Sequence, residues 1–414
     1  MRRSVLLVTY HYLPAQTPGS RRLDTVARLL AARGWTVKIL TATGARRGDT
    51  TSVPGIEVIR TTRATSHGAD GQPAITSPRV SRIPLLRSVT GFPDKYAPWA
   101  LTLGRRVDRL VRSGVVDVVL SSSPPHSMHA AIAAVHALHP FPWVAEFRDP
   151  WMFPTRRVLS PVSATLQRRM ERAVLRGASV VIANTPGNRD ELLASNPGLD
   201  PARVRVSTNG YDAALFAPGA LPARAGETAD FTYVGEIYGG MLERYAAAVA
   251  SIRARDPDAV PRLAIYGTVH AGERRRIAEL GLEPYVEQRG FVSHEESVAA
   301  MKNARALLVL LPPQERWRTC VPSKMYWYLA ARRPIVALVP EGDAARLVRD
   351  AHAGEVLADP DAEALGRRLE ALVREARAHP APALSGAGTE RYAMDAIVAG
   401  LEQILEEVVN GRPA

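Results

Sequence analysis

Short apolar runs alternate with amphipathic stretches along the first half of the chain. The apolar runs predict strands at residues 4–9, 36–40, 115–120, 143–147 and 179–183. The stretches between them repeat apolar residues at helical spacing and predict helices at residues 21–33, 101–112, 128–138 and 166–176. Alternation of this kind is typical of βαβ units and of a parallel sheet covered by helices on both faces.

A second series of the same kind begins near residue 229, with strands expected at residues 231–234, 262–266, 306–311 and 335–338. The two series are separated by a stretch rich in proline, glycine and alanine, which reads as a linker. A chain of 414 residues is also too long for one ordinary core. We therefore predict an α/β protein with two Rossmann-like, doubly wound parallel-sheet domains: residues 1–217 and 229–388, joined by residues 218–228 and followed by a helical segment, 389–414.

The charge and the cysteine content narrow the function classes. The net charge is +12, and lysine occurs only four times, so the excess is almost all arginine, which indicates a high-GC genome. The basic residues are spread along the chain without interleaved aromatics, which disfavours nucleic-acid binding and leaves peripheral attraction to anionic lipid or to a phosphorylated substrate. The single cysteine, Cys320, suits a reducing compartment. No apolar run has the length of a membrane span, and we expect a cytoplasmic protein.

The stretch from residue 321 to 340, VPSKMYWYLAARRPIVALVP, predicts a loop, a helix at 322–332 and a buried strand. Pro322 suits the first turn of a helix, and Ser323 offers a capping oxygen. The start of such a helix presents backbone N–H groups and a positive dipole end, which together suit an anion such as a diphosphate. An ordinary capped helix in an αβ unit would show the same pattern.

This stretch resembles the donor-site signature of the retaining sugar-nucleotide glycosyltransferases of family four (glycosyl transferases group 1). The resemblance rests on Pro322-Ser323-Lys324 and on the segment from Tyr328 to Pro334. It implies the GT-B architecture, with a central cleft between the two domains and a last helix that packs back on the N-terminal domain. The chain departs from the family at Thr319 and Trp327, where relatives often carry a pair of glutamates, and Glu315 could replace one of them.

Other segments of the first half also resemble the family. The loop that runs from His11 to Gly19 is similar to the N-terminal loop in which a glycine lets the backbone approach the donor. The segments SSSPPHS (121–127) and EFRDPW (146–151) follow two predicted strands and resemble motifs of one subgroup. The resemblance implies that Asp149, Arg148 and His126 serve catalysis on the acceptor side, where Asp149 would orient an acceptor hydroxyl or take its proton. An ion pair of Arg148 with Asp149 that only closes the strand end stays open as an alternative.

In the second half, a glycine-rich loop begins at Gly235, but Met241 stands where relatives often have an arginine, and Arg244 lies one turn later. The donor-binding residues that the resemblance implies are Gly19, Gly235, Arg244, Thr268, Arg289, Gly290, Phe291, Pro322, Ser323, Lys324 and Trp327. No ligand spacing for a metal is visible, so no metal and no cofactor are expected beside a UDP- or GDP-linked sugar as co-substrate. We also expect the NGYD turn at 209–212 to close the first domain and residues 62–78 to form a mobile loop on the acceptor side.

The predicted function is transfer of a sugar from a nucleotide-diphosphate sugar to a small-molecule or glycan acceptor, with retention of the anomeric configuration. Because the two glutamates are missing, other functions remain as alternatives. These are S- or N-glycosyl transfer in antibiotic biosynthesis, nucleotide-sugar epimerisation, and a catalytically silent GT-B binding protein. The sequence does not separate UDP from GDP and gives no oligomeric state.

Overall fold

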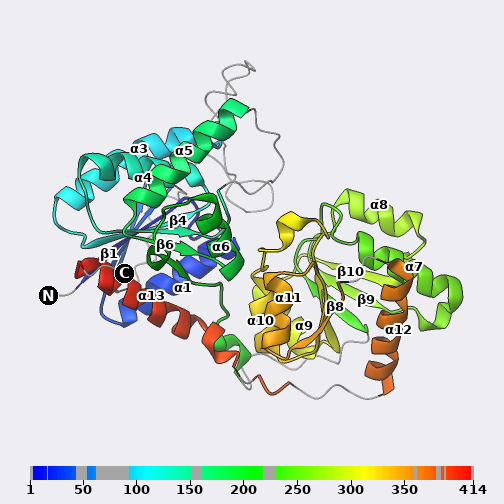
Figure 1. Cartoon of the computed structure of the whole chain (residues 1–414). Helices are drawn as coiled ribbons and strands as arrows, with labels where there is room; N and C mark the ends of the chain where they lie inside the picture. Colours follow the sequence, from blue (N-terminus) through cyan, green and yellow to red (C-terminus); the bar gives the residue numbers. More distant parts are fainter. Residues whose placement is uncertain are drawn as a thin grey trace. The chain divides into compact units, whose positions relative to one another are not determined.

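The computed structural model describes residues 3–15, 17–42, 54–61, 93–151, 161–217, 229–358, 361–378, 384–386 and 388–411. The predicted acceptor loop at 62–78 and the linker at 218–228 lie outside these residues. The chain divides into two compact units: unit 1 is Met1–Thr208 with Asp395–Ala414, and unit 2 is Asn209–Met394. Each unit contains its own parallel sheet, which confirms the predicted fold class (Figure 1).

The sheet of unit 1 has seven parallel strands in the order β3-β2-β1-β4-β5-β6-β7. Their bounds are β1 Ser4–Thr9, β2 Thr36–Thr41, β3 Ile56–Arg60, β4 Val118–Ser123, β5 Trp143–Phe147, β6 Val180–Ala183 and β7 Val204–Val206. The chain builds outward from β1 in one direction and then returns to place β4 on its other side. Ligands of doubly wound sheets bind at such a switch point, at the carboxyl ends of the strands.

Helices cover both faces of this sheet. They are α1 Pro18–Ala32, α3 Ala97–Arg112, α4 His126–Leu138, α5 Pro161–Gly177, α6 Pro186–Ser195 and α13 Met394–Val409. In Figure 1, α3, α4 and α5 lie on one side of the sheet and α1 and α13 on the other. The final helix α13 buries Val398, Leu401 and Leu405. It also accepts a hydrogen bond of 2.9 Å on Glu402 from the indole N–H of Trp35, so it belongs to unit 1 although it ends the chain.

The sheet of unit 2 has six parallel strands in the order β10-β9-β8-β11-β12-β13. The strands are β8 Phe231–Val234, β9 Leu263–Tyr266, β10 Val286–Gly290, β11 Ala306–Leu310, β12 Ile335–Leu338 and β13 Gly354–Val356. The helices are α7 Glu243–Arg255, α8 Ala271–Glu279, α9 His294–Asn303, α10 Lys324–Ala331, α11 Asp343–Asp350 and α12 Ala362–Ala378. Tyr211 exchanges backbone hydrogen bonds of 3.0 Å with Tyr392 and Met394, so the two segments that lead to unit 1 run side by side.

Short 3-10 helices complete the two units. They are η1 Pro201–Arg203, η2 Ala213–Phe216, η3 Pro257–Ala259, η4 Glu283–Tyr285, η5 Glu315–Trp317 and η6 Glu390–Tyr392.

Two local predictions are wrong. Ser121, Ser122 and Ser123 were expected in a loop but form the buried end of β4. Two of the buried hydroxyls have partners outside β4: the Ser123 hydroxyl donates to the Glu146 carbonyl of β5 at 3.3 Å, and the Ser121 hydroxyl lies 2.9 Å from Nδ1 of His129 in α4. The helix expected at 322–332 is α10 and starts at Lys324; Ser323 precedes it with helical backbone angles, and its side chain caps nothing.

Candidate functional site

The carboxyl edge of the unit 1 sheet gathers His11 and the three residues predicted on the acceptor side. His11 follows β1, His126 follows β4, and Arg148 and Asp149 follow β5. Because β1, β4 and β5 are neighbours in the sheet, their ends meet at the switch point. Asp149 is exposed and Arg148 is partly buried beside it. The sequence motifs that were expected to lie together therefore do lie at one edge.

The Arg148 side chain lies against the first turn of α1. A Cβ added to Gly19 would stand 1.8 Å from Nη1 of Arg148. The Arg148 Nε donates to the carbonyl of Ser123 at 2.9 Å, which fixes the guanidinium at this position. In this structure the space over Gly19 is filled by an arginine. Arg148 attracts the neighbouring Asp149 carboxylate and so lowers its pKa, but burial raises that pKa more strongly.

His126 is a neutral side chain at this edge. Its ring stacks on Trp151, with 5.1 Å between the centroids and 18° between the planes. Burial, the neighbouring His129 and Arg148 together lower the pKa of His126 to about 3. Its Nδ1 is buried and meets no partner in the described residues, which is common where a ligand or water completes a polar site. His126 can therefore hydrogen-bond to a sugar hydroxyl but carries no charge at neutral pH.

His129, one turn further along α4, is part of the core. Its Nδ1 lies 2.9 Å from the Ser121 hydroxyl and its Nε2 lies 3.2 Å from the carbonyl oxygen of Glu146. Since a carbonyl can only accept, Nε2 carries the proton and Nδ1 accepts from the serine. The residue is fully buried, and burial lowers its pKa to about 3. This geometry assigns His129 to packing, whereas His126 of the same helix has an Nδ1 that meets no partner among the described residues.

A buried ion pair supports this edge and was missed from the sequence. Arg22 of α1 and Glu146 of β5 approach to 2.8 Å, with 7% and 2% of their side chains exposed. Glu146 also comes two residues before Arg148, and its charge raises the pKa of that arginine while burial lowers it more strongly. The one sequence signal is a glutamate inside an apolar strand, but its partner lies far away in the chain.

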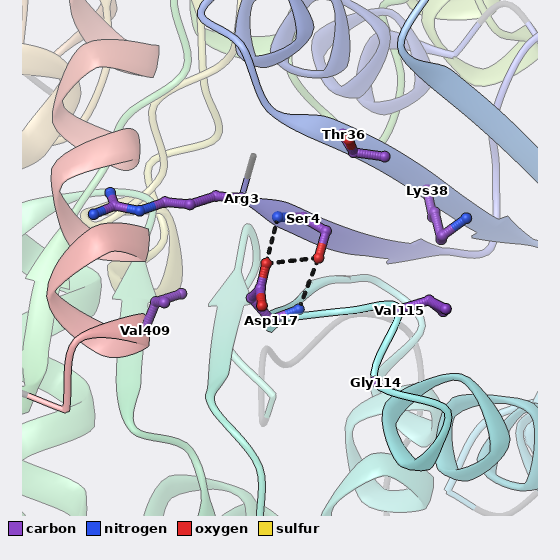
Figure 2. Close-up of a pocket in the computed structure, with 8 residues that line it drawn as sticks. All are labelled: Arg3, Ser4, Thr36, Lys38, Gly114, Val115, Asp117 and Val409. Atoms are coloured by element: carbon purple, nitrogen blue, oxygen red, sulfur yellow. Dashed lines mark hydrogen bonds between the residues drawn. The ribbon is translucent and has the colours of Figure 1, made fainter. Parts of the chain in front are cut away.

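A hollow at the opposite edge of the unit 1 sheet does not have the chemistry of a site. Figure 2 shows that it is lined by the start of β1 and β2, by the segment that leads into β4 and by Val409; the lining residues are Arg3, Ser4, Thr36, Lys38, Gly114, Val115, Asp117 and Val409. The Asp117 carboxylate accepts from the backbone N–H of Ser4 at 2.6 Å and from its hydroxyl at 2.7 Å. Lys38 is paired with Glu57, and Arg3 with Glu406. The charged groups of this hollow already have partners.

In unit 2, Lys324 lies at the carboxyl end of the central strand β8. Its Nζ is 3.7 Å from the centroid of the Tyr233 ring, and a Cβ added to Gly235 would lie 3.2 Å from the same Nζ. Burial lowers the pKa of Lys324 to about 7, against the weaker opposing effects of Cys320 and Glu236. Burial therefore outweighs the attraction of these groups, and an anionic ligand beside Lys324 would favour its charged form.

Glycines allow close contact between the ends of β8 and β9 beside Lys324, and a hydrogen bond joins α10 to the end of β8. Gly235 has a φ of +119°, and Gly267, after β9, has a φ of +147°. A Cβ on Gly267 would lie 2.1 Å from the carbonyl oxygen of Gly235. The Tyr328 hydroxyl of α10 accepts a hydrogen bond of 2.9 Å from the Val234 N–H, which ties the helix to the strand end. The end of β8, the end of β9 and α10 are therefore held as one cradle.

The start of α10 offers two backbone donors to this cradle. The N–H of Met325 donates to Pro322 at 2.9 Å, and the N–H of Tyr326 donates to Ser323 at 3.3 Å. The N–H groups of Ser323 and Lys324 meet no acceptor among the described residues. Two adjacent amides, a positive helix end and a lysine suit the oxygens of a phosphate group.

The remaining predicted donor residues lie in several places. Arg244 of α7 donates to the carbonyl of Leu357, after β13, at 3.1 Å. Trp327 of α10 packs between His294 and Phe216, with ring centroids at 4.6 and 5.8 Å. At the end of β9, the Thr268 carbonyl accepts from the N–H of Ile237.

The last strand end of the set is β10. Arg289 pairs with Glu287 at 2.8 Å, and the Phe291 side chain is 80% exposed just after Gly290. An exposed aromatic ring at the carboxyl end of a strand is a suitable platform for a ligand ring. The guanidinium of Arg289 is already paired with Glu287.

No cluster of three or more His, Cys, Asp or Glu residues in the described part of the chain could hold a metal ion. Among the described helices, none is long and apolar enough to cross a membrane.

Comparison with known proteins agrees with the geometry of both units. The family described as "Glycosyl transferase 4-like domain" matches residues 19–210, and "Glycosyl transferases group 1" matches residues 228–375. No curated protein matches the chain in sequence.

Many solved structures share the fold at low sequence identity. Sucrose-phosphate synthase of Thermosynechococcus elongatus is 17% identical, with a TM-score of 0.67 over 99% of this chain and 100% of that one. A glycosyltransferase of Rickettsia africae is 13% identical, with a TM-score of 0.65 over 99% of both chains. HepE of Anabaena, solved with UDP and glucose, is 15% identical, with a TM-score of 0.64 over 98% of this chain and 100% of that one. The chain belongs to the GT-B glycosyltransferases of the glycosyl transferases group 1 family.

Proposed function

We propose that this glycosyltransferase takes its sugar from a nucleotide-diphosphate sugar held by unit 2 and transfers it with retention of the anomeric configuration. The observation that carries the proposal is the position of Lys324, above Gly235 and beside the two amides that begin α10. Departure of a nucleoside diphosphate develops negative charge, and donors already in place stabilise that charge without reorganisation. HepE of Anabaena, which shares the fold, was solved with UDP and glucose, and this supports a nucleotide donor.

Each group of the cradle has a role in the proposed transfer. Lys324 and the amides of Ser323 and Lys324 bind the diphosphate, and a proton on Lys324 neutralises the leaving group. Tyr233 holds the lysine in place through its ring face. Burial of Lys324 outweighs the attraction of Glu236, and the diphosphate adds the negative charge that keeps the lysine protonated. No metal ion is needed for these contacts.

Unit 1 serves the acceptor in this proposal. Asp149 is exposed at the switch point, so its carboxylate can accept a hydrogen bond from the hydroxyl that attacks the sugar. His126, neutral at working pH, hydrogen-bonds to the acceptor or to the sugar in transfer. Arg148, held by the Ser123 carbonyl over Gly19, keeps positive potential at the same edge. The acceptor is a small molecule or a glycan.

Ligand-dependent thermal unfolding tests the donor site. A ligand that binds only the folded state raises the unfolding temperature as its concentration exceeds its dissociation constant. We expect one nucleoside diphosphate among UDP, GDP, ADP, CDP and dTDP to stabilise the enzyme clearly, and Lys324→Met to remove most of that effect. Lys95→Met, at an exposed lysine of unit 1, is the matched control. No stabilisation by any of the five, or the same stabilisation in Lys324→Met, would overturn the proposal.

A further inference from the structure

Two helices of unit 1 expose a dense set of arginines. Helix α3 carries four of them and helix α5 carries four, and all eight side chains are exposed. They are Arg105, Arg106, Arg109, Arg112, Arg168, Arg169, Arg172 and Arg176. We call this set the basic face. Helix α4 packs between α3 and α5 and contains no Asp, Glu, Lys or Arg, so it does not interrupt the positive charge.

Acidic residues do little to neutralise the basic face. Each of the two helices contains one acid, Asp108 in α3 and Glu171 in α5. Asp108 is only partly exposed, and it lies 3.0 Å from His139 and 4.0 Å from Arg112. Glu171 is buried, and burial raises its pKa to about 7. Within the described part of the chain, Arg112 is the one arginine of the basic face that forms a salt bridge.

Large apolar side chains on the same two helices are also exposed to solvent. Leu101 in the second turn of α3 is 76% exposed, Val162 at the start of α5 is 78% exposed, and Leu166 one turn later is 43% exposed. Both helices run antiparallel to the strands, so their first turns lie at the carboxyl edge of the sheet. On α5, Val162, Leu166 and Arg169 follow one another at helical spacing and share its outer side. The outer surface is thus apolar near the carboxyl edge and basic behind it.

We propose that the basic face, together with Leu101, Val162 and Leu166, docks unit 1 on an anionic lipid bilayer. Arginines near a membrane are attracted by anionic headgroups, and exposed aliphatic side chains enter the boundary between headgroups and acyl chains. Among the described residues, the exposed part of this surface offers aliphatic and no aromatic side chains, which favours lipid over a nucleic acid, whose bases stack on aromatic rings. Only the outer side of each helix would contact the bilayer, and neither helix would insert fully. We therefore expect reversible, peripheral binding.

The orientation of this docking has a consequence for the acceptor site. The apolar turns of α3 and α5 lie at the carboxyl edge, where Asp149, Arg148 and His126 also lie. A bilayer against this surface therefore brings the predicted acceptor residues close to lipid headgroups.

Sedimentation with vesicles tests the docking surface. The full-length protein is mixed with phosphatidylcholine vesicles that contain either no phosphatidylglycerol or about 30 mol% of it. We expect binding only to the anionic vesicles, and a loss of binding when the salt rises from about 100 to about 500 mM. A short single-stranded DNA serves as the competing polyanion. Retention on the DNA without binding to anionic vesicles would overturn the proposal in favour of a nucleic-acid surface.

Three variants separate the surface from the total charge. Arg105, Arg109, Arg169 and Arg172 are changed together to Gln, and the control changes the same number of exposed arginines of unit 2 to Gln: Arg255, Arg275, Arg367 and Arg374. We expect the first variant to bind anionic vesicles at least tenfold more weakly and the control to stay within twofold of the wild type. Equal losses in both would overturn the proposal.

The third variant removes the apolar part and keeps the charge. It combines Leu101→Ser, Val162→Ser and Leu166→Ser, which are exposed positions where the fold loses little packing. We expect its binding to anionic vesicles to fall at least fivefold at constant salt, and binding equal to that of the wild type would contradict insertion of these side chains. Circular dichroism and unfolding temperature confirm that each variant is folded before it is compared.

Discussion

Lys324 predicts how diphosphate binding depends on pH. In the free enzyme its pKa is about 7, lowered mainly by burial. A bound diphosphate places negative charge beside the ammonium and raises that pKa, so the ligand binds with uptake of a proton. Above pH 7 a growing part of the free enzyme carries a neutral lysine and must be protonated before the complex reaches its full strength. Affinity therefore falls as the pH rises.

The magnitude follows from the fraction of charged lysine. With a pKa of about 7, half of the free enzyme is charged at pH 7 and roughly 3% at pH 8.5. If the lysine stays charged in the complex, the dissociation constant rises about 15-fold between these values, which corresponds to about 1.6 kcal/mol. The comparison starts at pH 7 because a terminal phosphate titrates near pH 6 and would oppose the effect below that value.

Isothermal titration calorimetry measures both quantities. Titrations of the diphosphate found by thermal unfolding, in buffers of different ionisation enthalpy, give the dissociation constant and the number of protons taken up at each pH. We expect uptake of about half a proton at pH 7 and close to one at pH 8.5. In Lys324→Met both the uptake and the pH dependence disappear, whereas Lys95→Met keeps them. A wild-type dissociation constant that is flat over this range would refute the reasoning.

Three other substitutions have expected outcomes. Gly19→Ala places a Cβ where Nη1 of Arg148 lies, so we expect turnover to fall at least tenfold with little change in unfolding temperature. Glu146→Gln leaves Arg22 as a buried charge without its counter-ion, and we expect the free energy of unfolding, from urea titration, to fall by about 3–5 kcal/mol. Lys324→Met removes a buried lysine whose pKa is lower in the folded state than in the unfolded chain. The stability of the wild type therefore rises with pH above 7, and we expect the substitution to remove that rise and to stabilise the free enzyme at pH 7 by on the order of 1 kcal/mol.

Matched controls separate these effects from general damage. Gly272→Ala also changes a glycine in the first turn of a helix, but a Cβ there meets no atom within 4 Å, so turnover should be unchanged. Glu287→Gln breaks an exposed pair with Arg289 and should alter stability by less than about 1 kcal/mol. Equal losses in either control and its test variant would contradict the roles assigned to Gly19 and Glu146.

The sequence predicts the central strands well because buried parallel strands are continuous apolar runs. The bounds of β1, β5, β8 and β12 were expected to the residue. Edge strands are predicted less well, because they are less buried or too short to form an apolar run. The strand β10 reads VEQRG and is mostly exposed, and β13 has three residues, so neither shows an apolar run. The last residues of β4 are serines, and the partners of the Ser121 and Ser123 hydroxyls lie on α4 and β5, which a local pattern does not contain.

The candidate site divides in the same way. Arg148, Asp149, His126 and Lys324 are visible in the sequence because they follow strands or open a helix at recognisable motifs. The pair of Arg22 with Glu146 was missed, since the two residues lie 124 positions apart and only the fold brings them together. The contact of Arg148 with Gly19 and that of Lys324 with Tyr233 also depend on packing between elements. Motifs name the residues, but their partners come from the tertiary structure.

Turnover of the donor tests the central claim most directly. The nucleotide sugar whose diphosphate stabilises the enzyme is incubated with wild type, Lys324→Met and Lys95→Met, and proton NMR follows the anomeric signals. The account predicts slow release of nucleoside diphosphate and of sugar with the donor's anomeric configuration by wild type and Lys95→Met, and a loss of at least tenfold in Lys324→Met. A donor that binds yet stays intact with every form of the enzyme, or that Lys324→Met consumes at the wild-type rate, would contradict it.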